Sequence, residues 1–312
     1  MFLLAAMLWG FAFSAQKAAD ELPAFTVGAT RNIVAVAFLL LAIPFLDKLA
    51  KNGRHLVSKK RPLDFTKVEL IGGIACGTVL TAAPAFQQIG LSDGTDAGKA
   101  AFITELYVLI VTILYRLLGK KSPLTVWISV GVAIIGFYLL CIKSDFTIEA
   151  SDALVLICAL IFALHIITID HFSPSCDGVR MSCIQFFTSF ILNTILALIF
   201  EWPINMPLVG ECLPSLLYLG ICSSGIAYTL QIVGQKNVNP SVASVILSLE
   251  SVFGVIGGML FLGETMSTRQ YIGCTIVFLA VVLSQIDVVS IIRSKRAKDK
   301  KIEDSSHPEA YE

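Results

Sequence analysis

Charged residues are scarce in this sequence. Only 15% of its 312 residues are Asp, Glu, Lys or Arg, against roughly 25% in an ordinary soluble domain. In contrast, 56% of the residues are hydrophobic, and the mean hydropathy is +0.80. This composition argues against a soluble globular chain, and the formal net charge of +0 argues against a nucleic-acid-binding protein. The sequence therefore indicates a membrane protein with several spans.

Patterns typical of catalysis and of metal binding are also missing. The four histidines form no HExxH motif, and the chain has no GxSxG motif and no phosphate-binding glycine loop. The eight cysteines include no CxxC pair and lie mostly in apolar runs, which is typical of small packing residues. We therefore predict that the chain is not an enzyme, uses no cofactor, and has no disulfide or metal site.

Apolar runs of membrane-spanning length are abundant. Windows of about 20 apolar residues predict an all-α protein with ten transmembrane helices. These windows are 2–19, 24–46, 67–90, 98–118, 124–142, 152–172, 180–200, 213–234, 240–262 and 268–289. The first run lacks the basic leader and the cleavage site of a signal peptide, so we interpret it as a span.

The distribution of basic residues predicts the orientation of the chain. If the N-terminus is cytoplasmic, most Lys and Arg residues fall in cytoplasmic segments, above all in the loop at 47–66 and in the tail at 290–312. Because positive charge is retained on the cytoplasmic side, we predict a multi-pass protein of the cytoplasmic (inner) membrane with both termini cytoplasmic. The basic segments then need no nucleic-acid partner.

The two halves of the chain follow the same plan. A single shift along the sequence lays Gln87 on Gln231 and Gly119 on Gly263, and brings Glu105 to within one position of Glu250. We predict two repeats, at 2–142 and 152–289, each with five spans. Because five is an odd number, the second repeat must cross the membrane in the opposite direction. Such inverted repeats are typical of carriers that expose one site alternately to the two sides.

Three segments carry a resemblance to a known family. They are LWGFAFSAQKAA, ATRNIVAVAFLL and SLESVFGVIGGMLFLGE. Together with the duplicated ten-span layout, they resemble the EamA-type members of the drug/metabolite transporter superfamily. The resemblance implies a ten-helix bundle around a central cavity and a role in exporting amino acids and related metabolites. Two positions depart from the family pattern: Ser251 replaces a proline, and Gly119 is followed by Lys120 instead of Glu.

Glu250 is the carboxylate whose burial most needs an explanation. It lies about ten residues into its predicted span, which is roughly 15 Å deep at 1.5 Å per residue. Such a carboxylate is either a coupling or gating group that binds a proton or an amine, or a cap for polar groups of a neighbouring helix. Ser241, Ser244, Ser248 and Ser251 form a small polar stripe around it, and Gly254 and Gly258 form a GxxxG packing motif.

Three more charges are predicted at one level of the bilayer. Lys17, Arg31 and Glu105 should face a common interior, because an unpaired charge facing lipid costs several kcal/mol. One reading is a structural ion pair between Arg31 and Glu105. The other is a site for a zwitterion, in which Arg31 or Lys17 binds a carboxylate and Glu105 binds an ammonium group. We expect substrate recognition near Arg31 and Glu105, and gating near Glu250.

Other polar and aromatic residues within the spans are candidates for the cavity. Gln87, Tyr228, Gln231 and Gln235 either bind a ligand or join helices. Trp9 is either a packing anchor or an aromatic wall, and His165 is either a proton relay or a neutral hydrogen-bonding residue.

These features predict a secondary transporter that exports amino acids or related small metabolites by alternating access. An alternative is an antiporter of nucleotide sugars or phosphorylated metabolites, which would need several inward-facing Lys or Arg residues. A channel or a structural membrane protein is a weaker alternative. The expected partners are the lipid bilayer, a small-molecule substrate and protons, and the sequence is compatible with a monomer or a dimer.

Overall fold

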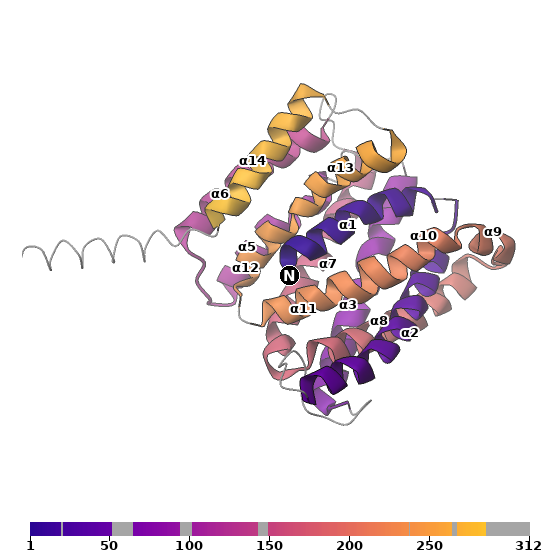
Figure 1. Ribbon diagram of the computed structural model, residues 1–312. Helices are drawn as coiled ribbons and strands as arrows, with labels where there is room; N and C mark the ends of the chain where they lie inside the picture. The colour runs from indigo at the N-terminus through magenta and orange to yellow at the C-terminus, as the bar shows by residue number, and fades with distance from the viewer. Residues whose placement is uncertain are drawn as a thin grey trace, which may run out of the picture.

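The computed structural model describes residues 1–19, 21–51, 65–93, 102–142, 149–236, 238–263 and 267–284. The predicted tail at 290–312 and most of the loop at 47–66 lie outside the described residues. The helices pack side by side, with their long axes along one common direction (Figure 1).

All secondary structure in the described part of the chain is helical. The α-helices are α1 (Phe2–Lys17), α2 (Ala24–Lys51), α3 (Lys67–Ser92), α5 (Tyr107–Leu117), α6 (Leu124–Cys141), α7 (Ala150–Phe172), α8 (Gly178–Phe200), α9 (Met206–Glu211), α10 (Leu213–Tyr218), α11 (Thr229–Gln235), α12 (Pro240–Leu247), α13 (Leu249–Leu262) and α14 (Thr268–Ser284). A 3₁₀ turn, Ser173–Ser175, follows α7, and a π-helical segment, Leu219–Tyr228, joins α10 to α11.

Six stretches of the described chain are long and apolar enough to cross a membrane. They are Ala24–Lys48, Lys67–Gln87, Ala150–Ser175, Gly178–Phe200, Leu213–Gln235 and Pro240–Phe261. Shorter apolar helices are Phe2–Lys17, Leu124–Leu140 and Thr268–Ser284. Each of the ten predicted windows contains helix, whereas the count of ten spans stays a prediction. Because helices satisfy their own backbone hydrogen bonds, they suit a chain that passes repeatedly through lipid.

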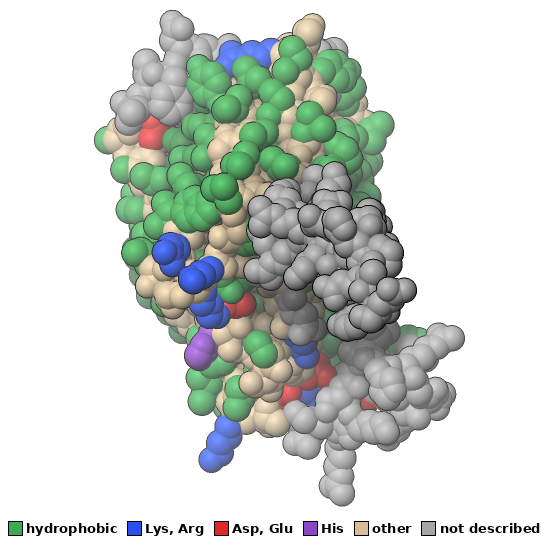
Figure 2. All heavy atoms as spheres, turned by 90° about the vertical axis from the view of Figure 1, so that its left-hand side faces the viewer, with side chains coloured by type: hydrophobic (Ala, Val, Ile, Leu, Met, Phe, Trp, Pro, Cys, Tyr) green, Lys and Arg blue, Asp and Glu red, His purple; other side chains and the backbone are tan. Residues whose placement is uncertain are grey.

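The outer surface is rich in large hydrophobic side chains. Leu41 of α2, Leu198 of α8 and Phe278 of α14, for example, are all at least half exposed. Figure 2 shows hydrophobic side chains over much of one face, with the Lys and Arg side chains in a few groups. A surface of this kind would aggregate in water but is compatible with lipid tails.

Glycines at equivalent positions end one helix in each half. After α5, Gly119 has φ +76°, and after α13, Gly263 has φ +68°. This left-handed conformation is accessible to glycine at little cost and is common at helix C-termini. The two residues are the pair that the sequence shift aligned, so the shared turn chemistry is present in the structure.

Helices α1 and α13 approach closely at glycines. A Cβ atom added to Gly10 would lie 2.3 Å from Phe253 Cβ and 2.7 Å from the backbone atoms Glu250 O and Gly254 N. On α13, Gly254 and Gly257 face α1. The packing role predicted for Gly254 is therefore supported. Gly257 also contacts α1, and the packing role of Gly258, which is buried, stays a prediction.

At the end of the bundle where α2 finishes and α8 begins, Arg180 is completely buried with carboxylates. Its Nη2 donates to Asp47 Oδ2 at 2.7 Å, and its Nη1 donates to Asp177 Oδ2 at 3.2 Å. The buried Glu69 accepts a hydrogen bond from the Asp177 backbone N–H at 3.1 Å. The cluster around Arg180 therefore joins α2, α3 and α8.

The contact between α1 and α13 generates the first prediction. Gly10→Ala should destabilise the protein by about 1–3 kcal/mol, because the new methyl group meets backbone atoms that cannot rotate away. Gly131→Ala on α6 is the control, since nothing lies within 4 Å of a Cβ at that position. Thermal unfolding in detergent checks this, and equal melting temperatures for the two variants would contradict the packing assignment.

The buried ion cluster generates the second prediction. Arg180→Met should cost about 3–5 kcal/mol, because it leaves buried carboxylates without their cation. Lys120→Met is the comparison, because it removes the ion pair between Lys120 Nζ and Asp170 Oδ2 (2.9 Å), in which the lysine side chain is 51% exposed. An exposed pair contributes about 0–1 kcal/mol. Denaturant titration in mixed micelles measures both values, and similar losses would refute the structural role of Arg180.

Candidate functional site

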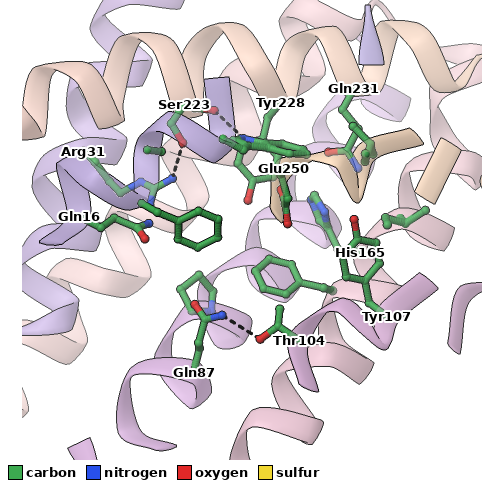
Figure 3. Close-up of a pocket in the computed structure, with 17 residues that line it drawn as sticks. Gln16, Arg31, Gln87, Thr104, Tyr107, His165, Ser223, Tyr228, Gln231 and Glu250 are labelled. Atoms are coloured by element: carbon green, nitrogen blue, oxygen red, sulfur yellow. Dashed lines mark hydrogen bonds between the residues drawn. The ribbon is translucent and has the colours of Figure 1, made fainter. Parts of the chain in front are cut away.

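A cavity of about 110 Å³ lies in the middle of the bundle, and we call it cavity 1. Its walls come from both halves of the chain. The lining residues are Trp9, Ala12, Phe13, Gln16, Arg31, Pro84, Gln87, Thr104, Tyr107, Phe162, His165, Ile166, Ser223, Tyr228, Gln231, Leu247 and Glu250. Figure 3 shows the polar side chains converging on one space from several helices.

Two helices that line cavity 1 each contain a local irregularity of one residue. Residues 102–105 are helical, a turn follows at Leu106, and α5 begins at Tyr107. In the second half, α12 ends at Leu247 and α13 begins at Leu249, with a turn at Ser248. Both turn residues keep right-handed helical dihedral angles, and the Ser248 N–H still donates to the Ser244 carbonyl at 3.0 Å. The two helices are therefore distorted beside the cavity without being interrupted.

The serine stripe lies at the second break rather than in the cavity. The hydroxyls of Ser244, Ser248 and Ser251 donate to carbonyls three residues earlier, at 2.8 to 2.9 Å. Ser241 contacts the Ser122 hydroxyl at 3.1 Å. Such bonds compete with regular helix geometry and commonly bend helices, so these serines are consistent with the local irregularity at Ser248, two residues before Glu250.

The π-helical segment positions a third part of the wall. Its wider turns leave the Ser223 carbonyl available to accept a hydrogen bond from Trp9 Nε1 at 3.0 Å. The Trp9 and Tyr228 rings are in contact, with centroids 4.6 Å apart. Trp9 is therefore both a packing anchor and an aromatic wall of cavity 1.

Arg31 contacts serines rather than a carboxylate. Its Nε donates to Ser224 Oγ at 3.0 Å, and its Nη2 lies 3.4 Å from Ser223 Oγ (Figure 3). No ion pair of Arg31 is found within the part of the chain that the structure describes. The expected structural pair between Arg31 and Glu105 is thus not formed, and a guanidinium group with donors to spare faces the cavity.

The structure places the two intramembrane carboxylates differently from expectation. Glu250 lines cavity 1 together with Arg31. Glu105 is 4% exposed, does not line the cavity, and has no hydrogen-bond partner for its Oε2 among the described residues. The two glutamates nevertheless interact electrostatically. The carboxylate available to a ligand is therefore Glu250, because Glu105, the expected recognition residue, lies behind the cavity wall.

Lys17 is exposed at the end of α1. It lines neither cavity 1 nor cavity 2, a second cavity beside the first. The charged residues in the walls of these cavities are therefore Arg31 and Glu250, among the residues that the structure describes. A lysine at a helix end can place its ammonium group in the interface, because its long side chain is flexible.

The glutamines divide into two groups. Gln87 and Gln231 line cavity 1, and Gln87 Nε2 donates to Thr104 Oγ1 at 2.9 Å. Gln235 lies outside the cavity, where its Nε2 donates to the Ile166 carbonyl at 3.2 Å and joins α11 to α7. Gln235 is therefore a structural residue, whereas Gln87 both joins helices and offers its amide to the cavity.

His165 lines cavity 1 and is held by a neighbouring helix. Its Nε2 lies 3.0 Å from Gln185 Oε1, and its ring contacts Tyr228 at a centroid distance of 5.8 Å. Only 1% of His165 is exposed. These contacts match the reading of a hydrogen-bonding residue that fixes the cavity wall.

A second cavity of about 130 Å³ adjoins the first, and we call it cavity 2. The two share Gln16, Arg31, Pro84, Gln87 and Tyr228. Cavity 2 continues between α2, α3 and α8 along Gly28, Asn32, Thr81, Ser189 and Asn193. Arg31 and Gln87 therefore stand at the junction of a continuous polar space.

Sequence reasoning missed several of these residues. Gln16, Thr104, Tyr107 and Ser223 line cavity 1 but were not singled out. The Ser223-Ser224-Gly225 run inside an apolar span was a usable signal, because small polar residues there allow close helix contact.

In the described part of the chain, no group of three or more His, Cys, Asp or Glu residues is arranged to hold a metal ion. Seven cysteines in that part are free thiols, and five of them are buried.

Two curated relatives resemble this chain in sequence, and one solved structure resembles it in fold. An uncharacterized transporter of Archaeoglobus fulgidus is 31% identical over 292 residues, covering 91% of this chain and 84% of the relative. The uncharacterized transporter YwfM of Bacillus subtilis is 25% identical over 285 residues, covering 90% and 91%. A crystal structure with 16% identity covers 91% of this chain and 94% of its own, with a TM-score of 0.72, and so shares the fold.

The family match covers both halves of the chain. The EamA-like transporter family matches residues 1–142 and again residues 150–285. Together with the relatives named as transporters, this agrees with the prediction that the chain is not an enzyme. This multi-pass membrane protein belongs to the EamA-like transporter family of the drug/metabolite transporter superfamily.

Proposed function

We propose that this chain is a secondary transporter that exports amino acids or closely related zwitterions across the cytoplasmic membrane by alternating access. The observation that carries the proposal is that Arg31 and Glu250 line one cavity between the two halves of the chain. A guanidinium group binds a carboxylate in a bidentate manner, and a carboxylate binds an ammonium group. A zwitterion matches both charges without leaving a net charge buried.

Alternating access follows from the proposed inverted repeats. If α1, α2 and α3 correspond to α7, α8 and the run from α10 to α11, each contact between the halves should have a counterpart. In the first half, α3 packs on α7 and α8; in the second half, the run from α10 to α11 packs on the equivalent helices α1 and α2. In the same way, the contact of α5 with α7 has its counterpart in the contact of α13 with α1. Two further pairs, α2 with α8 and α6 with α14, each consist of two equivalent helices, one from each half. This exchange symmetry supports two equivalent arrangements that open to opposite sides.

The phosphorylated-metabolite alternative is less well supported. A phosphate or diphosphate group carries at least as much negative charge as a carboxylate and is usually held by several basic side chains. Among the described residues that line the two cavities, Arg31 is the only Lys or Arg. Since Lys17 lies elsewhere, the charge available in the cavities matches a single carboxylate better.

Glu250 is the proposed coupling group. It stands in the first turn of α13, two residues after Ser248, and lines the cavity that would hold the substrate. A carboxylate that binds either a proton or a substrate ammonium group, but not both, would couple the export of substrate to the entry of a proton. The proposed orientation places both termini in the cytoplasm and follows from the distribution of Lys and Arg.

Counterflow in proteoliposomes tests the substrate class. Purified protein should exchange labelled amino acids in a saturable manner. Arg31→Gln should raise KM by about tenfold to a hundredfold, because a hydrogen bond to a charged group contributes about 1.5–3 kcal/mol. Arg269→Gln is the matched control, since Arg269 lies over the Tyr138 ring and lines neither cavity. Lack of saturable exchange for every amine-bearing metabolite tested would refute the proposal.

A pH gradient tests the coupling role. Glu250→Gln should abolish gradient-driven accumulation and retain exchange with a raised KM, because glutamine accepts a hydrogen bond but cannot carry a proton across. Glu211→Gln on α9 is the control, because this glutamate is exposed and lines neither cavity. Accumulation by Glu250→Gln at the wild-type level would assign Glu250 a structural role.

A further inference from the structure

Cavity 2 contains a hydrogen-bonding cluster that the proposed site for a zwitterion does not use. Asn32 of α2, Thr81 of α3, and Ser189 and Asn193 of α8 all line it, and each is nearly buried. Gly28 also contributes, because any Cβ there would lie 2.5 Å from Asn193 Oδ1. The cluster begins one residue after Arg31, so it lies beside the point where the two cavities meet.

The hydrogen bonds of this cluster converge on Ser189. Thr81 Oγ1 is the donor in its contacts with the Gly77 carbonyl at 2.8 Å and with Ser189 Oγ at 2.9 Å. Ser189 Oγ is therefore an acceptor toward Thr81.

Both amides direct their NH₂ groups at Ser189. Asn32 Nδ2 donates to Ser189 Oγ at 2.9 Å, and Asn193 Nδ2 donates to the Ser189 carbonyl at 2.8 Å. With their NH₂ groups used in this way, both side chains direct carbonyl oxygens elsewhere. Asn193 Oδ1 lies against Gly28. Asn32 Oδ1 has no hydrogen bond among the described residues and is an acceptor without a donor.

We propose that cavity 2 binds the side chain of the transported amino acid and selects uncharged side chains that donate a hydrogen bond, namely amides and hydroxyls. This inference rests on the proposed function, which places the substrate carboxylate at Arg31. The acceptor on Asn32 disfavours an anionic side chain. Among the described residues that line cavity 2 there is no Asp or Glu, so a cationic side chain would have no counter-charge there.

The selection should be measurable in the wild-type protein. Threonine and valine have nearly the same shape, and so do asparagine and leucine. Each of these four amino acids, unlabelled, is added as a competitor of a labelled amino acid in counterflow. Threonine and asparagine should inhibit roughly five to ten times more strongly than their apolar counterparts, the factor expected for one hydrogen bond. Aspartate and lysine should inhibit weakly.

Asn32→Leu tests the residue assignment. The variant loses the acceptor at nearly constant volume, so the ratio of inhibition constants for threonine and valine should fall close to one. A merely structural defect would lower transport of both competitors equally and leave this ratio unchanged. Thr78→Val on α3 is the control, because its hydroxyl donates to the Ile74 carbonyl of its own helix and it lines neither cavity. It should keep the wild-type ratio.

The outcomes separate the two proposals. If the wild type exchanges amino acids but threonine and valine compete equally, the selection by cavity 2 is refuted while the transport proposal stands. An unchanged threonine-to-valine ratio in Asn32→Leu also refutes it. If no amino acid is exchanged in a saturable manner, the proposed function fails, and this inference fails with it.

Discussion

The bilayer requires every backbone polar group to find a hydrogen-bond partner within the protein, and this requirement explains why departures from helix occur where they do. The turns at Leu106 and Ser248 and the π segment at Leu219–Tyr228 all border cavity 1. In lipid, an unpaired backbone group would cost several kcal/mol. At the two turns the backbone keeps hydrogen bonds within its own helix, and in the π segment the Ser223 carbonyl accepts from Trp9 Nε1.

The buried charged groups also need partners within the protein, and two arginines meet this need in different ways. Arg180 is enclosed by carboxylates, which makes it part of the framework at one end of the bundle. Arg31 has serines as its hydrogen-bond partners among the described residues, and it lines a cavity. The same residue type therefore has a structural role in one place and is available for binding in the other. The difference lies in whether an internal carboxylate already satisfies the cation.

Local features could be predicted well because neighbouring residues determine them. The positions of the helices, the glycine turns at Gly119 and Gly263, and the packing role of Gly254 depend on short-range composition and backbone conformation. Trp9, Arg31, Gln87, Tyr228 and Gln231, named as candidates for the cavity, line cavity 1, and so does the proposed coupling residue Glu250. Lys17, Gln235 and Glu105 do not line it, because the direction in which a side chain points depends on the packing of the helices.

The sequence by itself determined the class of protein, since its apolar runs suit only a chain that passes repeatedly through lipid, and its motifs indicated the family. Only the tertiary structure decided which charged residues line the same cavity. Arg31 and Glu250 both line cavity 1, whereas Glu105 is buried and does not line it. The physical reason is that a helix in lipid is apolar on nearly every side. Its sequence therefore carries little periodic signal for its rotation, which is set by packing against other helices.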